Sequence, residues 1–225
     1  MPALADLLNI HDAMLQRLGP SHWWPAETPF EVCLGAILTQ NTNWGNVEKA
    51  IANLARHDLL DPFKLFETDG EKLAELIRPA GYYRIKAGRL QNFLFFLRDE
   101  AGFHVPALRE YETGDLRERL LRVKGIGAET ADSIVLYAFH KPSFVVDAYT
   151  ARIFERHGLI RENIGYEELR SLFMEALPED VSLYQEYHAL LVRTGKWWCR
   201  KKHGLCSDCP LSTVTNVERN TSGGH

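Results

Sequence analysis

Residues 120–136 of the chain read LLRVKGIGAETADSIVL, in which two glycines lie one residue apart between two apolar stretches. The pattern predicts a short amphipathic helix over residues 115–123 and a second helix over residues 128–140. Glycine allows backbone conformations that are closed to other residues, and it leaves no Cβ to block an approaching group. The second helix would therefore present its free N–H groups to a phosphate, with Lys124 beside it. A tight helix–helix turn without a ligand is the alternative.

The rest of the chain is also helical in pattern, because apolar residues recur at three- and four-residue intervals almost throughout. Helices are expected near residues 3–18, 30–39, 46–57, 72–78, 86–98, 116–123, 129–139, 148–157, 167–176 and 183–194. Strand-like alternation is scarce, and FVV at 144–146 is too short to count. The stretch after Leu211 is polar without periodicity, so we expect it to be disordered.

The composition is that of a globular protein with a sizeable core: 225 residues, 45% apolar and 25% charged. No apolar run is long enough to span a bilayer, and the N-terminus lacks the features of a secretory signal, so the cytoplasm is the expected compartment. A net charge of −4 argues weakly against nucleic acid as a partner. Local patches decide that question, however. Two acid-free runs, Arg78–Arg89 and Arg193–His203, carry four and five Lys or Arg residues together with aromatic residues, although a solvated helix face is the alternative for each.

Three of the four cysteines, Cys199, Cys206 and Cys209, lie close together near the C-terminus. In a cytosolic chain such a group favours a metal over a disulfide. The fourth, Cys33, lies alone in the apolar run FEVCLGAIL and is expected in the core.

These motifs, taken in order, resemble those of the helix-hairpin-helix DNA glycosylase superfamily, of which endonuclease III is the best-known member. The resemblance extends from about Trp23 to Leu211. It rests on the segment LTQNT at 38–42, the loop GYYRIKA at 81–87, the hairpin KGIG at 124–127, the segment VVDAYTAR at 145–152 and the tail C-x6-C-x2-C. Among its branches, the 3-methyladenine DNA glycosylases are the most similar, because of the tandem tryptophans described below.

The resemblance implies an all-α fold of two helical domains, with a cleft for DNA and the target base between them. A six-helix domain over residues 24–138 would carry the hairpin. Residues 1–23 and 139–211 would form the second domain with the cysteine loop, and residues 212–225 would be a disordered tail.

Glu129 occupies a position that separates two kinds of enzyme within this superfamily. In bifunctional members a lysine two residues after the second glycine forms a Schiff base with the sugar and cleaves the strand. A carboxylate cannot form a Schiff base, so the resemblance implies a monofunctional enzyme that uses water. Glu129 also suits the start of a helix, where an acid interacts favourably with the dipole, and the two interpretations are compatible.

Asp147 matches the catalytic aspartate of the family. Breaking an N-glycosidic bond develops positive charge on the deoxyribose, which a nearby carboxylate stabilises while it orients or deprotonates water. Its position also predicts an N-cap for the helix that begins at Ala148. In this family the same aspartate performs both roles.

The remaining expected site residues follow from the same resemblance. An enzyme that acts on a base in duplex DNA must flip the nucleotide out. Gln40 matches the residue that enters the vacated space, and Tyr82 matches the wedge beside the opposite strand. The hairpin would contact the DNA backbone through Lys124, Gly125, Ile126, Gly127 and Thr130. The base pocket would be formed by Trp23, Trp24, Pro25, Trp44 and Lys196.

The tryptophans indicate the substrate, because alkylated purines such as 3-methyladenine carry a positive charge that electron-rich rings bind better than a neutral base. Ordinary core packing is the alternative for Trp23 and Trp24. Lys196 matches a lysine that can be carbamylated in or near the pocket, and a plain phosphate contact is equally compatible with its position.

The cysteine set is incomplete for an iron–sulfur cluster. A [4Fe–4S] cluster usually takes four thiolates, and the family's fourth cysteine position is Thr215 here. Three interpretations stay open: a cluster with three cysteines and a foreign ligand, a loop that has lost its cluster, and a zinc site completed by His203. In the first, the cluster would hold the basic loop against the DNA backbone.

We therefore predict a monomeric, cytoplasmic, nucleoid-associated DNA glycosylase of base excision repair, which hydrolyses the N-glycosidic bond of alkylated purines in double-stranded DNA and does not bind membranes. One rival is an endonuclease III-like glycosylase for oxidised pyrimidines or for uracil or thymine mismatches. A second rival is a non-catalytic protein that binds DNA structure, which would need neither Asp147 nor an aromatic pocket.

Overall fold

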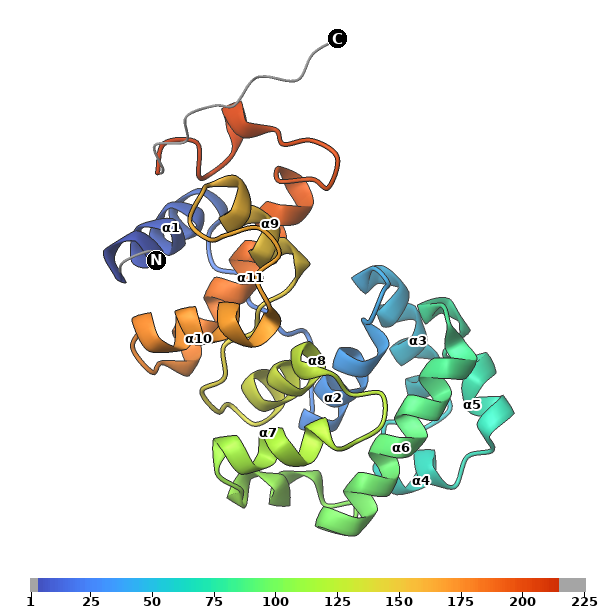
Figure 1. Ribbon diagram of the computed structural model, residues 1–225. Helices are drawn as coiled ribbons and strands as arrows, with labels where there is room; N and C mark the ends of the chain where they lie inside the picture. The colour runs from blue at the N-terminus through green and yellow to red at the C-terminus, as the bar shows by residue number, and fades with distance from the viewer. Residues whose placement is uncertain (1–3, 215–225) are drawn as a thin grey trace. The chain divides into compact units, whose positions relative to one another are not determined.

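The computed structural model describes residues 4–214, and within this range every regular element is a helix (Figure 1). The predicted all-α fold class is therefore confirmed, with one isolated antiparallel bridge between Cys199 and Gly204 as the sole β-type pairing of the described residues. No helix in the described range is long and apolar enough to cross a membrane. Most of the tail that we expected to be disordered, residues 215–225, lies outside the described range.

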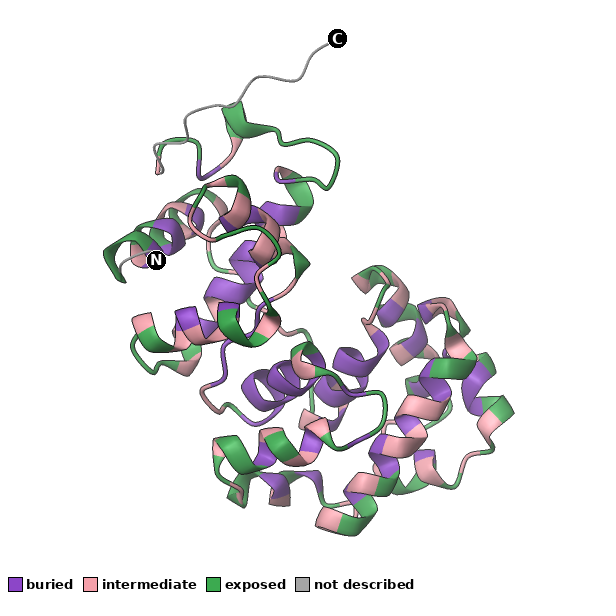
Figure 2. Cartoon of the chain, viewed as in Figure 1, coloured by how far each residue is buried: buried purple, intermediate pink, exposed green. Residues whose placement is uncertain are grey.

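The chain divides into two compact units: unit 1 comprises Met1–Trp23 and Phe144–His225, and unit 2 comprises Trp24–Ser143. Unit 2 contains α2 (Pro29–Leu38), α3 (Trp44–Arg56), α4 (Pro62–Phe66), α5 (Gly70–Leu76), η1 (Arg78–Ala80), α6 (Tyr83–Ala101), η2 (Val105–Glu110), α7 (Thr113–Leu121), α8 (Ala128–Ser133) and η3 (Ile134–Ala138). Helix α2 starts at the Thr28 cap with Pro29 in its first turn, and it is buried at nearly every residue (Figure 2). It contacts α3, α6, α8, η2 and η3, so it is central in this unit, as an apolar sequence all round a helix predicts.

The second helix of the glycine hairpin differs from the expected regular helix over residues 128–140. Helix α8 ends at Ser133, and the chain continues as the π-helical turn η3, all five residues of which are buried. Wider π turns occur mostly as single turns within α-helices. The periodicity of an α-helix could not predict this change, because the whole segment is apolar.

Unit 1 contains α1 (Leu4–Leu18), α9 (Ala148–Arg156), α10 (Tyr166–Ala176), α11 (Val181–Trp197) and η4 (Cys206–Asp208). Its core is aromatic: the Phe144 and Phe173 rings stack at 4.2 Å between centroids, and Tyr187 meets both edge-on. The buried Tyr187 hydroxyl donates a hydrogen bond of 2.8 Å to the Leu7 carbonyl, which ties α11 to α1. Phe144 belongs to the FVV segment, which forms no strand and is buried at all three residues.

Candidate active site

Asp147 lies at the N-terminus of α9, and its two carboxylate oxygens have different surroundings. Oδ1 accepts hydrogen bonds from the Tyr149 and Thr150 amides, at 2.9 and 2.8 Å, and from the Thr150 hydroxyl at 2.9 Å. The predicted N-cap is therefore confirmed. Oδ2 takes part in none of these bonds. Because the helix N-terminus favours negative charge, the cap holds a carboxylate in a fixed orientation with one oxygen left for chemistry.

His188 of α11 is the group that faces this second oxygen, and sequence reasoning missed it. Its Nε2 lies 3.9 Å from Asp147 Oδ2, and both side chains are about one-tenth exposed. Burial lowers the pKa of His188, and the negative charge of Asp147 only partly opposes that shift. At neutral pH the imidazole is therefore neutral.

The lowered pKa of His188 predicts a pH-dependent stability. Unfolded histidine has a pKa of about 6.5, so below that pH the unfolded chain takes up a proton that the folded protein does not bind. This residue therefore lowers stability as pH falls below about 6.5, with a slope of at most about 1.4 kcal/mol per pH unit, and has no such effect above it. Urea unfolding of wild type and His188→Gln between pH 5 and 7.5 should show the wild type losing stability relative to the variant towards low pH. Parallel profiles would show that burial does not hold the imidazole neutral.

Helix α9 is fastened to α11 by close contact at a glycine. A Cβ added to Gly195 would lie 2.4 Å from Tyr149 Cδ1, so only glycine lets this ring approach. Arg152 strengthens the contact: its Nε donates to the Cys199 carbonyl at 2.7 Å, and its guanidinium lies 5.0 Å from the Tyr149 ring. Because Tyr149 is two residues after Asp147, these contacts also place the carboxylate. Lys196, the next residue along α11, is exposed.

The cysteine loop after α11 is held by an arginine of α9. Arg156 donates to the Arg200 and Lys201 carbonyls, at 2.8 and 3.0 Å, and to Cys199 Sγ at 3.4 Å. Burial raises the pKa of the Cys209 thiol, and the nearby Cys199 and Cys206 add a smaller effect. Within residues 4–214, however, no group of three or more His, Cys, Asp or Glu side chains is arranged to hold a metal ion. Thr215, the position of the family's fourth cysteine, lies outside the described residues.

The glycine hairpin of unit 2 joins α7 to α8. Gly125 has a φ of +97°, a conformation that favours glycine, and a Cβ there would lie 2.4 Å from Arg89 Cγ. Ile126 is buried beneath the turn. The two helices are held together by a buried ion pair, in which Arg117 donates to both oxygens of Asp132 at 2.8 and 3.1 Å. The turn is thus held on its protein-facing side by Ile126 and the ion pair, while Lys124 and both glycines are exposed to solvent.

Gln40 lies against this hairpin. Its Nε2 donates to the Gly125 carbonyl at 3.2 Å and to the Thr130 hydroxyl at 2.8 Å, and its Oε1 accepts a hydrogen bond from Arg89. The structure therefore brings together three of the residues that the sequence indicated. Arg89 was not among them, although it ends the basic run Arg78–Arg89.

Tyr82, the expected wedge, is exposed over 68% of its surface. It has a φ of +46°, directly after Gly81 with a φ of +70°, so the loop turns sharply and projects the ring. The same basic run contains Lys86, which is not on the surface at all: it is 1% exposed and cannot contact phosphate.

The two tryptophans of unit 2 form an aromatic cluster. The Trp24 ring meets the Trp44 ring edge-on at 5.2 Å and the Tyr137 ring at 5.1 Å. A Cβ at Gly35 would lie 3.1 Å from Trp24 and 3.2 Å from Trp44, so this glycine of α2 lets both rings approach the helix. Pro25 is exposed, and Trp23 belongs to unit 1.

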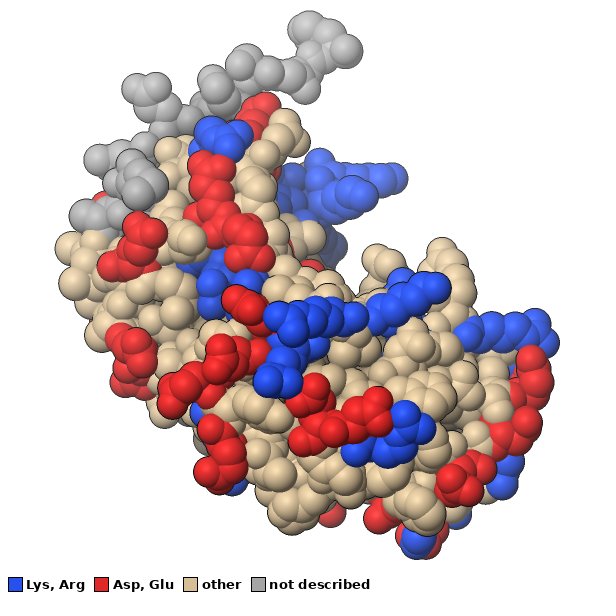
Figure 3. Space-filling model, turned by 60° about the horizontal axis from the view of Figure 1, so that its bottom comes forward, with Lys and Arg blue, Asp and Glu red and all other residues tan. Residues whose placement is uncertain are grey.

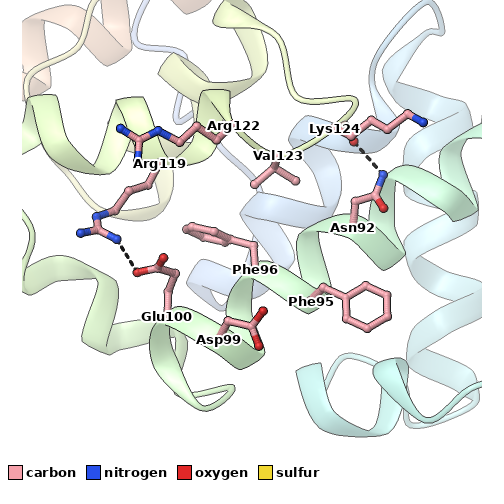
Figure 4. Close-up of a pocket in the computed structure, with 9 residues that line it drawn as sticks. All are labelled: Asn92, Phe95, Phe96, Asp99, Glu100, Arg119, Arg122, Val123 and Lys124. Carbon is pink, nitrogen blue, oxygen red and sulfur yellow. Dashed lines mark hydrogen bonds and ion pairs between the residues drawn. The ribbon is translucent and has the colours of Figure 1, made fainter.

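A separate pocket of about 340 Å³ lies between α6 and α7, next to the hairpin (Figure 4). Its lining includes Phe95, Phe96 and Val123, together with Asn92, which donates a hydrogen bond of 2.9 Å to the Lys124 carbonyl. Nothing in the sequence pattern pointed to it. On the face shown in Figure 3, acidic and basic side chains are interspersed.

Comparison with known proteins identifies the family. Residues 34–179 match the model described as HhH-GPD superfamily base excision DNA repair protein. A protein of Methanocaldococcus jannaschii named "Putative DNA repair glycosylase MJ1434" is 50% identical over 206 residues, which cover 91% of this chain and 93% of that protein. Endonuclease III of Thermotoga maritima is 31% identical over 196 residues, which cover 87% and 86%.

Two solved structures agree with this result. The H. pylori 3-methyladenine DNA glycosylase bound to 1,N6-ethenoadenine has a TM-score of 0.74 and 30% identity, with 87% of this chain and 98% of that chain covered. A non-covalent Endonuclease III–DNA complex has a TM-score of 0.81 at 24% identity, with 96% and 97% covered, and shows that the fold is shared.

The chain belongs to the HhH-GPD superfamily of base excision DNA repair proteins, as its motifs predicted. Within that superfamily it is a DNA N-glycosylase.

Proposed function

We propose that the protein is a monofunctional glycosylase that acts as a monomer on duplex DNA and releases alkylated purines such as 3-methyladenine. The bond between the purine nitrogen and the sugar C1′ breaks, and the base leaves with the bonding electrons. Water adds to C1′ and gives up a proton, so the products are the free base and an abasic site.

The observation that carries this proposal is that the helix cap uses only one of the two carboxylate oxygens of Asp147. Oδ1 is used by the cap, so the carboxylate cannot rotate freely. Oδ2 is then the oxygen that stabilises positive charge on the sugar and accepts the proton of the attacking water. A neutral His188 beside it places no positive charge against Oδ2, which suits this role.

Glu129 supports the monofunctional reaction. It lies exposed in the first turn of α8, two residues after Gly127, where bifunctional members carry their nucleophilic lysine. The lysine of the described hairpin is Lys124, which comes directly before the two glycines and not two residues after them. We therefore assign the attack to water and Lys124 to a phosphate.

The aromatic cluster supports an alkylated purine as the substrate. Trp24 and Trp44 lie edge to face over Gly35, and both are partly exposed. A cationic base placed against their electron-rich faces gains cation–π attraction of about 0.5–2 kcal/mol that a normal base lacks. The 30% identical H. pylori protein is named for 3-methyladenine, which agrees with this assignment. Trp23, Pro25 and Lys196 are further candidates for contacts with the flipped base.

The DNA duplex would be held by unit 2. The exposed glycine hairpin with Lys124 suits the phosphate backbone, since Gly125 and Gly127 leave room for close approach. Gln40 and Tyr82 would fill the duplex where the target nucleotide leaves it. For Gln40 to do so, its hydrogen bonds to the hairpin and to Arg89 must break. The entry of Gln40 into the duplex would therefore be coupled to the binding of DNA by the hairpin.

The three thiols of the C-terminal loop fall short of the four thiolates that a [4Fe–4S] cluster usually takes. Arg156 already satisfies two carbonyls of this loop and contacts Cys199 Sγ. If a cluster binds with a foreign fourth ligand, Cys199, Cys206 and Cys209 would hold it, and its role would be to shape the basic loop. The proposed reaction has no step that involves it.

Single-turnover excision on a panel of duplexes tests the substrate. Each duplex carries one alkylated purine, 1,N6-ethenoadenine, uracil, a thymine mismatch or an oxidised pyrimidine. We expect release of the alkylated purine, and we expect Trp44→Ala to slow it by about 10-fold, from the loss of about 1.4 kcal/mol of ring contact. Phe63→Ala, which removes an exposed aromatic residue of α4, is the matched control and should keep the wild-type rate.

Two results would contradict the proposal in different ways. Release confined to oxidised pyrimidines or mismatches would favour the endonuclease III-like alternative, which the 31% identity to the Thermotoga maritima enzyme makes the second candidate. Tight binding to damaged DNA without release of any base would favour a protein that binds DNA structure alone.

A further inference from the structure

Lys86 is the most deeply buried cationic side chain of α6. It is 1% exposed, and its ammonium donates hydrogen bonds to the Leu38 carbonyl at 2.8 Å and to the Ala80 carbonyl at 2.7 Å. A buried charge is costly unless hydrogen bonds compensate it, and such charge-assisted bonds are stronger than neutral ones. A methionine or leucine would fill this core position without that cost, so the ammonium is there for its two bonds.

The charge persists at neutral pH. Burial lowers the pKa of Lys86 to about 8, with a smaller contribution from the positive charge of Arg89. A group with that pKa is mostly protonated at pH 7, and hydrogen bonds to carbonyl oxygens favour the charged form further. Lys86 therefore offers three N–H donors to the two carbonyls.

These two carbonyls lie just ahead of Gln40 and Tyr82, the two residues that we expect to enter the duplex and call the wedges. Leu38 is the last residue of α2, and Gln40 follows two residues later. Ala80 is the last residue of η1, and the next two residues are Gly81 and Tyr82, both with positive φ. Tyr82 is held in a left-handed conformation that costs energy for a residue with a side chain, so the turn needs support from its surroundings. One ammonium thus joins two loops that are 42 residues apart in sequence.

Arg89 continues this arrangement along α6. Its guanidinium donates to Gln40 Oε1, and its aliphatic stem lies where a Cβ of Gly125 would be. Lys86 therefore holds the backbone ahead of Gln40, while Arg89 holds the Gln40 side chain against the hairpin.

We infer that Lys86 is a positioning residue for base flipping: by joining the Leu38 and Ala80 carbonyls, it holds the loops that carry Gln40 and Tyr82 at the separation at which both enter the duplex. This inference rests on the proposed function, because it assumes that Gln40 and Tyr82 fill the space that the flipped nucleotide vacates. Lys86 itself contacts no DNA and takes no part in the bond cleavage.

A double-mutant cycle separates this role from a merely structural one. Lys86→Met keeps the bulk of the side chain and removes both hydrogen bonds. We expect it to lower the single-turnover excision rate by about 10- to 100-fold, since an error of about 1 Å in positioning can cost 100-fold. Gln40→Ala/Tyr82→Ala should also be slow, and adding Lys86→Met to it should cost less than 2-fold more, because nothing is left to position.

Two further measurements complete the test. Leu90→Ala removes a fully buried side chain one turn along α6, so its effect on excision should be unchanged in the Gln40→Ala/Tyr82→Ala background. A 2-aminopurine opposite a stable abasic analogue reports whether wedges enter the duplex, and its fluorescence change on binding should be lost with Lys86→Met and kept with Leu90→Ala. If Lys86→Met does not fold, Lys86→Gln, which retains two N–H donors on a shorter side chain, replaces it.

Several outcomes would overturn the inference. The first is a Lys86→Met protein with the wild-type excision rate and fluorescence change. The second is a loss of excision rate from Lys86→Met that is equally large in the Gln40→Ala/Tyr82→Ala background. The third is failure of both Lys86 variants to fold, which would make the bonds essential to the whole unit. If wild type releases no base from any duplex, the proposed function fails instead. If Gln40→Ala/Tyr82→Ala retains the wild-type rate, there are no wedges for Lys86 to position.

Discussion

Asp147→Asn is expected to lower the single-turnover rate of base release by about 1,000-fold, in line with the loss of one preorganised electrostatic group from an active site. Asparagine keeps an oxygen in the place of Oδ1, so the amides of Tyr149 and Thr150 still find their acceptor. Asn and Asp are comparable N-caps, so the helix should be equally stable. What the variant lacks is the negative charge opposite the developing positive charge of the sugar.

Asp180→Asn provides the matched control for this variant. Asp180 caps α11 in the same unit, where its Oδ1 accepts a hydrogen bond from the Leu183 amide at 3.1 Å. It therefore undergoes the same chemical change at a cap with no assigned chemistry, and it should excise at the wild-type rate. Both variants should bind damaged duplex as tightly as wild type. Normal excision by Asp147→Asn would remove the catalytic assignment.

Gly195→Ala is expected to have the second large effect, on stability and rate together. Its new methyl group would lie 2.4, 2.7 and 2.8 Å from three atoms of Tyr149, which is a rigid ring and cannot turn away cheaply. Overpacking of this kind costs about 1–3 kcal/mol, or about 2–12 °C in Tm for a chain of this size. Since Tyr149 belongs to the first turn of α9, the shift also moves Asp147, and an error of about 1 Å there can cost about 100-fold in rate.

The control for Gly195→Ala is Gly88→Ala, in the middle of α6. A Cβ at Gly88 would meet nothing within 4 Å, so this change should stabilise the helix by about 0.5–1 kcal/mol. Thermal unfolding and single-turnover excision are measured on both variants. A Gly195→Ala protein with the wild-type Tm and rate would mean that the contact between α9 and α11 does not place the carboxylate.

The helices were predictable because a helix that buries one face has apolar residues at three- and four-residue intervals, and this spacing is visible in the local sequence. Helix α4 was missed, since five residues are too few to show a period. The π turn η3 was missed because a segment that is apolar on every side has no face to identify. Periodicity also says which side of a helix is buried but not which neighbour it meets, so the contact of Gly195 with Tyr149 could not be foreseen.

The candidate site was predictable where the type of a residue and its position in the sequence were enough to indicate its role. Asp147 before a helix predicted a cap, which the structure confirms, while its catalytic role stays a prediction. Lys86 shows the limit: in a run of basic residues it looked like a surface cation, and the depth of a side chain depends on tertiary packing. His188 and Arg89 were missed for the same reason, since their partners are 41 and 49 residues away.

Borohydride trapping is the most direct test of the claim that water, and not an amine, attacks the sugar. Wild-type protein is incubated with an alkylated-purine duplex and borohydride, with a bifunctional superfamily member as the positive control. We predict that the base is released, that the strand stays intact until alkali is added, and that no covalent protein–DNA product forms. A covalent product that accumulates with wild-type protein would contradict this account, because it would show that a lysine forms a Schiff base with the sugar.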